Sequence, residues 1–584
     1  MMYRVRAECS TLRGMHAELT ITSEQINSLP LLLGIMEDMD LRALIDQHVT
    51  PHGHWQGISV GTAVTIWLAC LLQERDHRLV LVRDWATARA HTLNTLLDIT
   101  LRDTDCSDDR LANLLTMLGD PATQATLDAA LIQQWVRVYR LPTETIRLDS
   151  TSVSVYHDPQ EPDSLLQFGH SKDHRPELRQ FKAMLATLDP LGLPLLCQMV
   201  GGERADDRLY VPAYDAAVAA LGTAAVLVVG DSKMAALTTR GHLVAHGSRY
   251  LCPYRPPRAT AELAGWVETA LARADAWQRI ETVDCETGAV TLVAVLHAWR
   301  RDQRWTDPAT MSEHTWSERV LVVRSSGYQA GQRTLRERAV TRLTDQLMTL
   351  WQPPARGRKR YSTRFELEQT VAAWIERAGL TGIVQAPVVE ERLADGTTRW
   401  TVERIAVELA AWEALVARLS WQVYVSNTTV EEYDAAALVA TYHQQPLLER
   451  DISRLKTRNL QIRPVYLRDE VRMAGLLWLL TLALRVLTLT EYRLRTVLAE
   501  RDEGVVGLNP ASRSQTTQRP TTERVLAAFA NLTVTTVVRD GAAERYLTPL
   551  NATQRHLLIL LKLPADLYDR LAMPRPNLVH HLRE

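Results

Sequence analysis

The sequence has no excess of either charge. Among its 584 residues, 66 Lys and Arg stand against 68 Asp and Glu, for a formal charge of −2. A polybasic coat is therefore excluded, and any surface that binds nucleic acid must be a local patch on a near-neutral body.

Cysteines are few and scattered. The six cysteines form no Cys-x-x-Cys pair, which argues against a disulfide scaffold or a zinc ribbon and suits a reducing cytosol. His52 and His54 are spaced like a metal-binding pair, but no acidic or Cys partner follows at ligand spacing. No G-x-G-x-x-G, Walker loop or G-x-S-x-G occurs at a useful place. We expect no nucleotide cofactor.

Long hydrophobic runs are also missing. The first residues, MMYRVRAECSTLRGMH, lack the apolar segment of a signal peptide. The most apolar stretch, Ala474 to Thr490, contains Arg485 and is about one turn short of a membrane span. With 46% hydrophobic and 23% charged residues, the chain is typical of globular proteins. We expect a cytoplasmic, multidomain protein without a membrane partner.

The pattern along the chain predicts an α/β fold. Apolar residues recur at helical spacing in residues 1–140, and β-branched segments alternate with helices in 141–255. The run Ala225 to Gly230 (AVLVVG) is typical of a strand buried on both faces. Residues 256–429 hold ten of the 15 tryptophans and mix strands with helices, which indicates an insertion domain. Helices resume in 430–490, and 491–584 form a C-terminal extension.

Two carboxylates adjoin predicted strands. Asp149 lies within IRLDSTSV, and Asp231 follows the buried strand in VLVVGDSKM. Either one alone could simply bond to local backbone or cap a helix. If their strands are neighbours, the two anions converge and need a cation between them. Oxygen ligands of this kind favour Mg²⁺ or Mn²⁺, and a pair of such ions serves in-line displacement at phosphorus.

A third carboxylate, Glu449, lies in TYHQQPLLERDISRLKTR. The segment reads as a helix that starts near Pro446, with Leu448, Ile452 and Leu455 on its core face. Glu449, Ser453 and Lys456 form an adjacent polar stripe, so a metal ligand and a phosphate-binding cation could share one face. A solvated polar face is the alternative interpretation.

These residues resemble the DDE triad of bacterial insertion-sequence transposases, in the group marked by Tyr-x2-Arg-x3-Glu-x6-Lys. Tyr442, Glu449 and Lys456 fall at that spacing. Three flanking segments agree in order: GHSKDHRPELRQFK from Gly169, WQVYVSNT from Trp421 and IRPVYLRDEVRMAGLL from Ile462. Two positions depart from the pattern, because Gln445 stands in place of the Arg and Pro446 follows it. His443 or Arg450 could supply the missing cation.

The resemblance implies an RNase H-like catalytic core interrupted by a largely β insertion. It implies a transposase that uses two Mg²⁺ or Mn²⁺ ions to cut at terminal inverted repeats and to join the 3′ ends to target DNA. Asp149, Asp231 and Glu449 would hold the ions, and Tyr442 and Lys456 would hold the terminal phosphates. The protein would act as a homodimer on double-stranded DNA in the bacterial nucleoid, with the helical N-terminal region reading the repeats.

Three basic clusters are candidates for phosphate contacts. They contain, among others, Arg358, Lys359 and Arg360 of the insertion, Lys172 beside the first strand, and Arg450 and Arg454 on the Glu449 helix. A solvated face is again the alternative for each cluster. Two other functions stay open: an RNase H-like nuclease that cuts without joining, and an inactive transposase that binds repeat ends as a repressor.

Overall fold

The computed structural model describes residues 19–573, except 52, 160–162, 256–260, 284–289, 353–360, 394–395, 510–511, 513 and 540–541. Arg358, Lys359 and Arg360 of the predicted basic cluster lie outside the described residues. The chain divides into two compact units, one made of Met1–Arg249 with Gln444–Glu584 and the other of Tyr250–His443.

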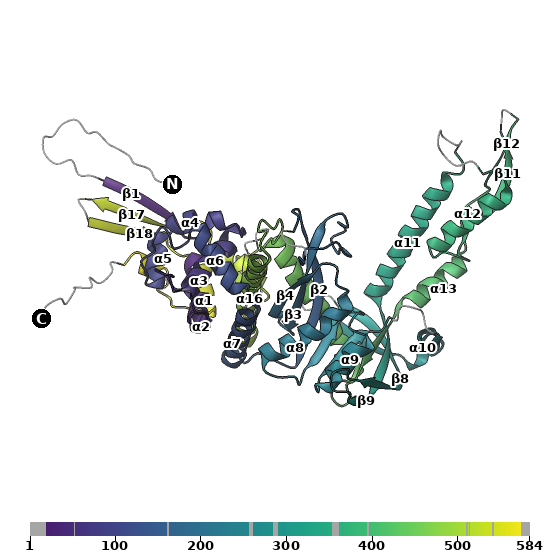
Figure 1. The fold of residues 1–584 in the computed structure, drawn as a ribbon, viewed down its shortest axis with the longest axis horizontal. Coiled ribbons are helices and arrows are strands. Elements are labelled where there is room, and N and C mark those ends of the chain that lie inside the picture. Colours follow the sequence, from purple (N-terminus) through teal and green to yellow (C-terminus); the bar gives the residue numbers. More distant parts are fainter. Residues whose placement is uncertain are drawn as a thin grey trace. The chain divides into compact units, whose positions relative to one another are not determined.

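The first unit begins with a helical region (Figure 1). Its helices are α1 (Leu29–Asp38), α2 (Leu41–His48), α3 (Val60–Glu74), α4 (Leu79–Thr87), α5 (Ala90–Leu97), α6 (Asp108–Leu118) and α7 (Pro121–Tyr139). Helix α3 is apolar on nearly every side and is buried from Val60 to Leu72, as expected for a helix surrounded by others. Its N-terminus is capped by the Ser59 side chain, which accepts a hydrogen bond from the Thr62 amide.

The sheet of this unit has the strand order β4-β3-β2-β5. Its strands are β2 (Thr145–Val155), β3 (Arg179–Leu188), β4 (Leu193–Gly201) and β5 (Leu227–Gly230). Strands β2, β3 and β4 are antiparallel neighbours, and β5 runs parallel to β2. All four residues of β5 are buried, which explains its unbroken apolar sequence. Helix α8 (Tyr210–Leu221) packs against β2, β3 and β4 and also contacts α9 (Leu237–Ala245).

The C-terminal part of the chain completes the first unit. It contains α15 (Gln445–Ser453), a π-helical turn over Arg454–Arg458, α16 (Glu470–Arg501), β15 (Val505–Val506), β16 (Thr516–Thr517), α17 (Thr522–Ala528), β17 (Thr533–Arg539), β18 (Ala542–Leu547) and α18 (Ala552–Leu560). Strand β17 pairs antiparallel with β18 and with β1 (Leu19–Gln25), so the two ends of the described chain share a sheet.

Helix α16 is the central helix of the first unit and contacts α3, α6, α17 and β4. It is long and apolar enough to cross a membrane by length and composition, but 94% of its most apolar window is buried inside the protein. Arg485 near its middle is fully buried and donates to the Asp128 carboxylate at 2.7 Å and to the Pro194 and Leu195 carbonyls. A charge bound in this way is typical of a helix in a protein core.

The second unit contains an antiparallel sheet and a helical projection. The sheet order is β6 (Arg249–Pro253), β14 (Trp421–Ser426), β9 (Glu313–Ser325), β8 (Val290–Thr306) and β7 (Gln278–Val283). The helices are α10 (Ala261–Ala272), α11 (Ser326–Met348), α12 (Arg364–Arg377), α13 (Leu409–Leu419) and α14 (Ala435–Tyr442), and the short strands are β10 (Val384–Gln385), β11 (Val388–Arg392), β12 (Thr398–Val402) and β13 (Ala406–Val407).

Within the second unit, α11, α12, α13 and the β11–β12 hairpin project away from β8 and β9 (Figure 1). This projection has a core of its own, which includes Leu347, Leu367, Val371 and Val416. The predicted α/β class with a helical N-terminal region is confirmed.

Candidate active site

Asp149 is placed by the sheet of the first unit. It lies in the middle of β2, opposite Leu185 of β3. Its Oδ1 accepts a hydrogen bond from the Ser150 amide at 2.7 Å, which orients the carboxylate. A half-buried carboxylate inside a strand needs compensating partners, so its surroundings are informative.

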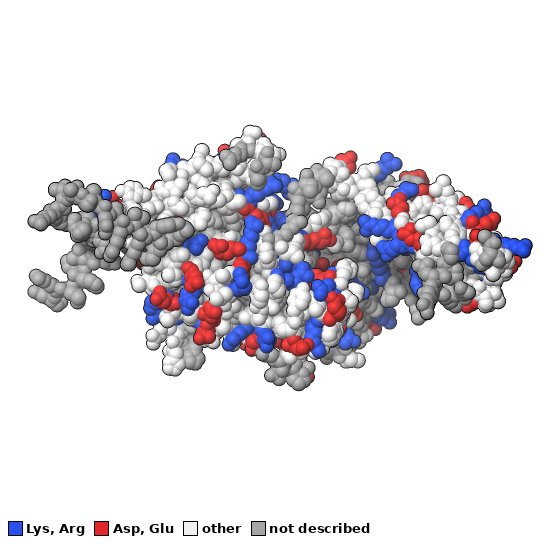
Figure 2. All heavy atoms as spheres, turned by 90° about the horizontal axis from the view of Figure 1, so that it is seen from above, with Lys and Arg blue, Asp and Glu red and all other residues white. Residues whose placement is uncertain are grey.

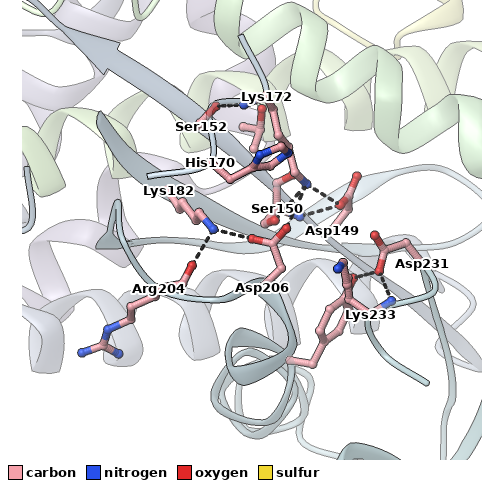
Figure 3. Close-up of polar contacts among 12 residues, drawn as sticks. Asp149, Ser150, Ser152, His170, Lys172, Lys182, Arg204, Asp206, Asp231 and Lys233 are labelled. Carbon is pink, nitrogen blue, oxygen red and sulfur yellow. Dashed lines mark hydrogen bonds and ion pairs between the residues drawn. The ribbon is translucent and has the colours of Figure 1, made fainter. Parts of the chain in front are cut away.

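Asp231 adjoins Asp149 because their strands are parallel neighbours. The register pairs Leu148 of β2 with Gly230, the last residue of β5, so the next residue of each strand is an aspartate. Figure 3 shows the two carboxylates close together at this edge of the sheet. The Tyr210 hydroxyl and the Lys233 amide both donate to Asp231 Oδ1 at 2.7 Å. The carboxyl ends of parallel strands are where open α/β sheets commonly bind ligands.

The charges at this site change the pKa values of Asp149 and Tyr210. Burial raises the pKa of Asp149, Lys172 opposes the rise, and the charge of Asp231 adds to it. Burial and both aspartates also raise the pKa of Tyr210 well above its usual value, so its hydroxyl keeps the proton that it donates to Asp231. Carboxylates with raised pKa values are typical of sites that bind a cation or a proton.

Lys172 is the cation nearest to Asp149. Its Nζ lies 3.4 Å from Asp149 Oδ1 and donates to the Ser150 carbonyl at 2.5 Å and to the Ser150 hydroxyl at 3.0 Å (Figure 3). Asp206 lies on its other side, with Oδ2 at 3.9 Å. Lys172, predicted to contact DNA, therefore also neutralises the candidate catalytic carboxylate.

Asp206 and Tyr210 are site residues that the sequence analysis missed. Asp206 accepts from Lys182 Nζ at 2.6 Å. Burial acts against its ionisation, but Lys182 and Lys172 hold the pKa of Asp206 below its usual range. In the sequence, Asp206 looks like an acidic residue in the first turn of a helix and Tyr210 like a core aromatic. Neither has a pattern that marks it as part of a site.

Glu449 lies on α15, which contacts β2. Its side chain is exposed, and its Oε1 accepts from Gln445 Nε2 at 3.2 Å. Across the described part of the chain, Glu449 forms no hydrogen bond or ion pair with Asp149 or Asp231. Gln445, one of the two positions that depart from the predicted motif, is thus a hydrogen-bond donor to Glu449.

Lys456 follows α15 and reaches the strand that carries Asp149. Its buried Nζ donates to Thr151 Oγ1 at 3.0 Å and to Asp173 Oδ1 at 2.5 Å. Arg463 Nη1 lies 2.9 Å from the other Asp173 oxygen. Burial lowers the pKa of Lys456, and the bond to Asp173 acts in the opposite direction. Asp173, another residue missed from sequence, belongs to the same segment as Lys172.

Arg450 and Arg454 point into the protein. Arg450 Nη1 and Arg454 Nη2 each lie 2.7 Å from a different oxygen of Glu491 in α16, and Arg454 Nε lies 2.8 Å from Glu523 in α17. Their guanidinium groups fix α15 to α16 and α17. Tyr442 belongs to the second unit, where its ring packs against Tyr424 with centroids 4.5 Å apart.

The described residues on the face shown in Figure 2 form no coat of a single charge. On the face shown in Figure 2, Lys and Arg are interspersed with Asp and Glu, as the charge balance predicts. Phosphate contacts would therefore be local.

The donor set at Asp149 and Asp231 fits a divalent cation. Both candidate ligands are carboxylates, and the pKa of Asp149 is raised mainly by burial, with a smaller contribution from the charge of Asp231. Hard oxygen donors of this kind select Mg²⁺ or Mn²⁺ over softer metals.

Comparison with known proteins gives one result for this chain. The family described as "Transposase DDE domain" matches residues 141–486. The match covers more than half of the chain and includes Asp149, Asp231 and Glu449. A search of the curated proteins finds no match.

Proposed function

The chain belongs to the DDE transposase family, and from this premise we propose that it cuts DNA at the terminal inverted repeats of its own element and joins the 3′ ends to target DNA. Proteins of this family bind DNA and generally use divalent metal ions. The observation that supports this reaction best is that Asp149 and Asp231 directly follow Leu148 and Gly230, which are paired residues of two parallel neighbouring strands.

Asp149 and Asp231 would hold the metal, and Glu449 would complete its ligands from α15. Two Mg²⁺ or Mn²⁺ ions, when bound, activate the attacking oxygen and stabilise the leaving oxygen of an in-line displacement at phosphorus. Tyr210 and the Lys233 amide both bind Asp231 Oδ1. These two hydrogen bonds would orient the Asp231 carboxylate for metal binding.

The reaction would comprise two displacements at phosphorus. Water attacks the phosphate at the transposon end, and the 3′ oxygen leaves with a proton as a free 3′-OH. That 3′-OH then attacks a target phosphate, and the target's own 3′ oxygen leaves. The same carboxylates serve both steps.

Lys456 and Tyr442 would hold the terminal phosphates. Lys456 is paired with Asp173 in the protein alone, so DNA would have to replace Asp173 as its anionic partner. Further phosphate contacts would come from Lys172, Arg450, Arg454 and the cluster of Arg358, Lys359 and Arg360. A cation that is paired inside the protein would have to exchange that ion pair for one with DNA. Because two ends are cut and joined, the DNA complex would contain a homodimer.

Cleavage and joining by the purified full chain test this proposal. Labelled duplexes would carry the terminal repeats of the element's own ends, with Mg²⁺ or Mn²⁺ present. Asp149→Asn, Asp231→Asn and Glu449→Gln would be compared with the wild type. The control is Asp207→Asn, which removes one negative charge from an exposed residue beside Asp206.

We expect cleavage at the repeat ends and joined products for the wild type and the control, and neither product for the three variants. Cleavage without joined products would indicate an RNase H-like nuclease instead. Binding to the repeats without cleavage in either metal would indicate a repressor.

A further inference from the structure

A second group of potential metal ligands lies away from the carboxylates of the candidate active site. Asp215 of α8, His242 in the last turn of α9 and His246 just after α9 each offer one ligand atom, and these atoms lie within 4.8 Å of one another. His242 and His246 are four residues apart, so their rings project from the same side of the helix. Their ring centroids are 4.2 Å apart.

The hydrogen bonds of this cluster leave a lone pair for a metal. His246 Nδ1 bonds to the His242 carbonyl oxygen at 2.9 Å. A carbonyl can only accept, so Nδ1 carries the proton and Nε2 carries the lone pair. This is the arrangement that orients metal-binding histidines in proteins. His242 Nε2 donates to Asp215 Oδ1 at 2.7 Å. A bound metal would replace the proton of this hydrogen bond, and the two ligand atoms already lie close together.

The packing beneath the cluster holds the two rings in place. Tyr214, next to Asp215 on α8, meets both rings edge-on, with centroids 5.9 Å from His242 and 6.3 Å from His246. Its hydroxyl is 2.7 Å from the Ser248 hydroxyl. Asp215 and His246 are exposed, so an ion can enter from solvent and both side chains can move to close the ligand distances.

We propose that Asp215, His242 and His246 form a transition-metal site, for Zn²⁺ or an ion of similar chemistry, that joins α8 to α9. Two imidazoles and one carboxylate suit Zn²⁺, Co²⁺ or Ni²⁺, whereas Mg²⁺ prefers oxygen ligands alone. Three protein ligands leave a further position for water. The observations that support this site do not depend on the proposed transposase reaction.

The site would brace the helix behind the candidate active site. Tyr210 begins α8 and donates to Asp231, and Asp215 lies little more than one turn later on the same helix. A metal bridge between Asp215 and α9 would therefore restrict the movement of the helix that orients Asp231.

Zn²⁺ titration of the full chain tests this site. The protein would carry no histidine tag, and Mg²⁺ would be present in excess to occupy oxygen-only sites. Calorimetry would give the stoichiometry and affinity, and the visible spectrum of bound Co²⁺ would report nitrogen ligands. The variants are His242→Ala and His246→Ala. The controls are His54→Ala, from the His52–His54 pair, and His556→Ala, in which the replaced histidine lies 3.6 Å from Glu503.

We expect one Zn²⁺ per chain, a higher melting temperature with Zn²⁺, and affinity at least tenfold weaker in both His242→Ala and His246→Ala. The two controls and Asp149→Asn should bind as the wild type does. The proposal is overturned if the wild type binds no Zn²⁺, or if the His242 and His246 variants bind it as tightly as the wild type.

Discussion

Lys172 provides Asp149 with a positive charge from within the chain. Its ammonium lies 3.4 Å from Asp149 and 3.9 Å from Asp206, and Asp149 is also a proposed ligand of the divalent cation. Lys172 therefore compensates part of the negative charge around Asp149 in the protein without metal.

Replacing Lys172 should make stability depend more strongly on metal. We expect Lys172→Gln to lower the free energy of unfolding without metal by about 1 kcal/mol, because a partly exposed ion pair is lost. Added Mg²⁺ should raise the melting temperature of this variant more than that of the wild type. Thermal unfolding with and without Mg²⁺ measures both effects. Lys233→Gln, which removes an exposed lysine near the site, should behave like the wild type.

His77 should make stability depend on pH. Burial, above all, lowers the pKa of this histidine, so the unfolded chain takes up a proton at a higher pH than the folded chain does. Stability therefore decreases as the pH falls below the ordinary histidine pKa of about 6.5, with a slope from this one group of at most about 1.4 kcal/mol per pH unit.

We expect His77→Gln to lose less stability between pH 7 and pH 5 than the wild type does. Urea unfolding at several pH values measures this difference. The exposed control His54→Gln should keep the wild-type slope. Parallel slopes for His77→Gln and the wild type would contradict the prediction.

At the scale of elements, the turn between β3 and β4 determines how closely α15 can approach. Gly192 has φ +74°, and a Cβ there would lie 2.8 Å from Asp451 Oδ2 of α15. The position of Glu449 therefore depends on a residue without a side chain more than 250 positions earlier in the chain.

Gly192→Ala should destabilise the protein and shift α15. A non-glycine residue at positive φ costs about 1–3 kcal/mol, and the contact with buried Asp451 adds to that cost. Gly247→Ala is the matched control, because Gly247 has φ +79° but no atom within 4 Å of its added Cβ. We expect a larger loss of unfolding free energy for Gly192→Ala in urea titrations. Equal losses would show that α15 does not press on this turn.

The contact of α16 with α7 and β4 depends on a buried ion pair. Asp128 accepts from Arg485 and from Trp478 Nε1 at 2.9 Å. Asp128→Ala would leave a buried guanidinium without its carboxylate, which costs about 3–5 kcal/mol. Chemical unfolding would measure this loss. The double variant Asp128→Leu/Arg485→Met should be less destabilised than Asp128→Ala, and greater destabilisation would contradict the account.

Much of the sheet could be predicted because its signals are local. The apolar run of β5 and the β-branched run of β2 each identify a strand. Asp149 lies within the first of these strands in the chain, and Asp231 directly follows the second. Asp173 and Asp206 could not be predicted, because their meeting with Lys456 and Lys172 depends on how loops fold over the sheet. The roles of Asp149, Asp231 and Glu449 stay predictions until cleavage is measured.

At the scale of the whole molecule, the two ends of the chain stabilise each other. Leu19 pairs with Arg539 and Gln25 with Thr533 in the sheet β1-β17-β18. Tyr568 donates to the Asn27 carbonyl at 3.0 Å. No local pattern could predict this pairing, because the partners are about 500 residues apart and the two strands carry few apolar residues.

Ending the chain at residue 530 should destabilise the N-terminal region. Strand β1 would lose its only pairing partner among the described strands, and Asn27 would lose Tyr568. We expect a lower melting temperature and rapid proteolysis near residues 19–28, measured by limited digestion and mass spectrometry. Wild-type resistance in the truncated chain would show that the N-terminal helices hold β1 without β17.

Because β1 pairs with β17, it is synthesised on the ribosome long before its partner strand exists. At roughly 5–20 residues per second, β1 waits about half a minute to two minutes before β17 is made. Throughout that time its backbone amides and carbonyls are open to any other extended segment. Chains made side by side on one messenger are thus the nearest alternative partners for this strand, and a chaperone that covers it would raise the yield of folded protein.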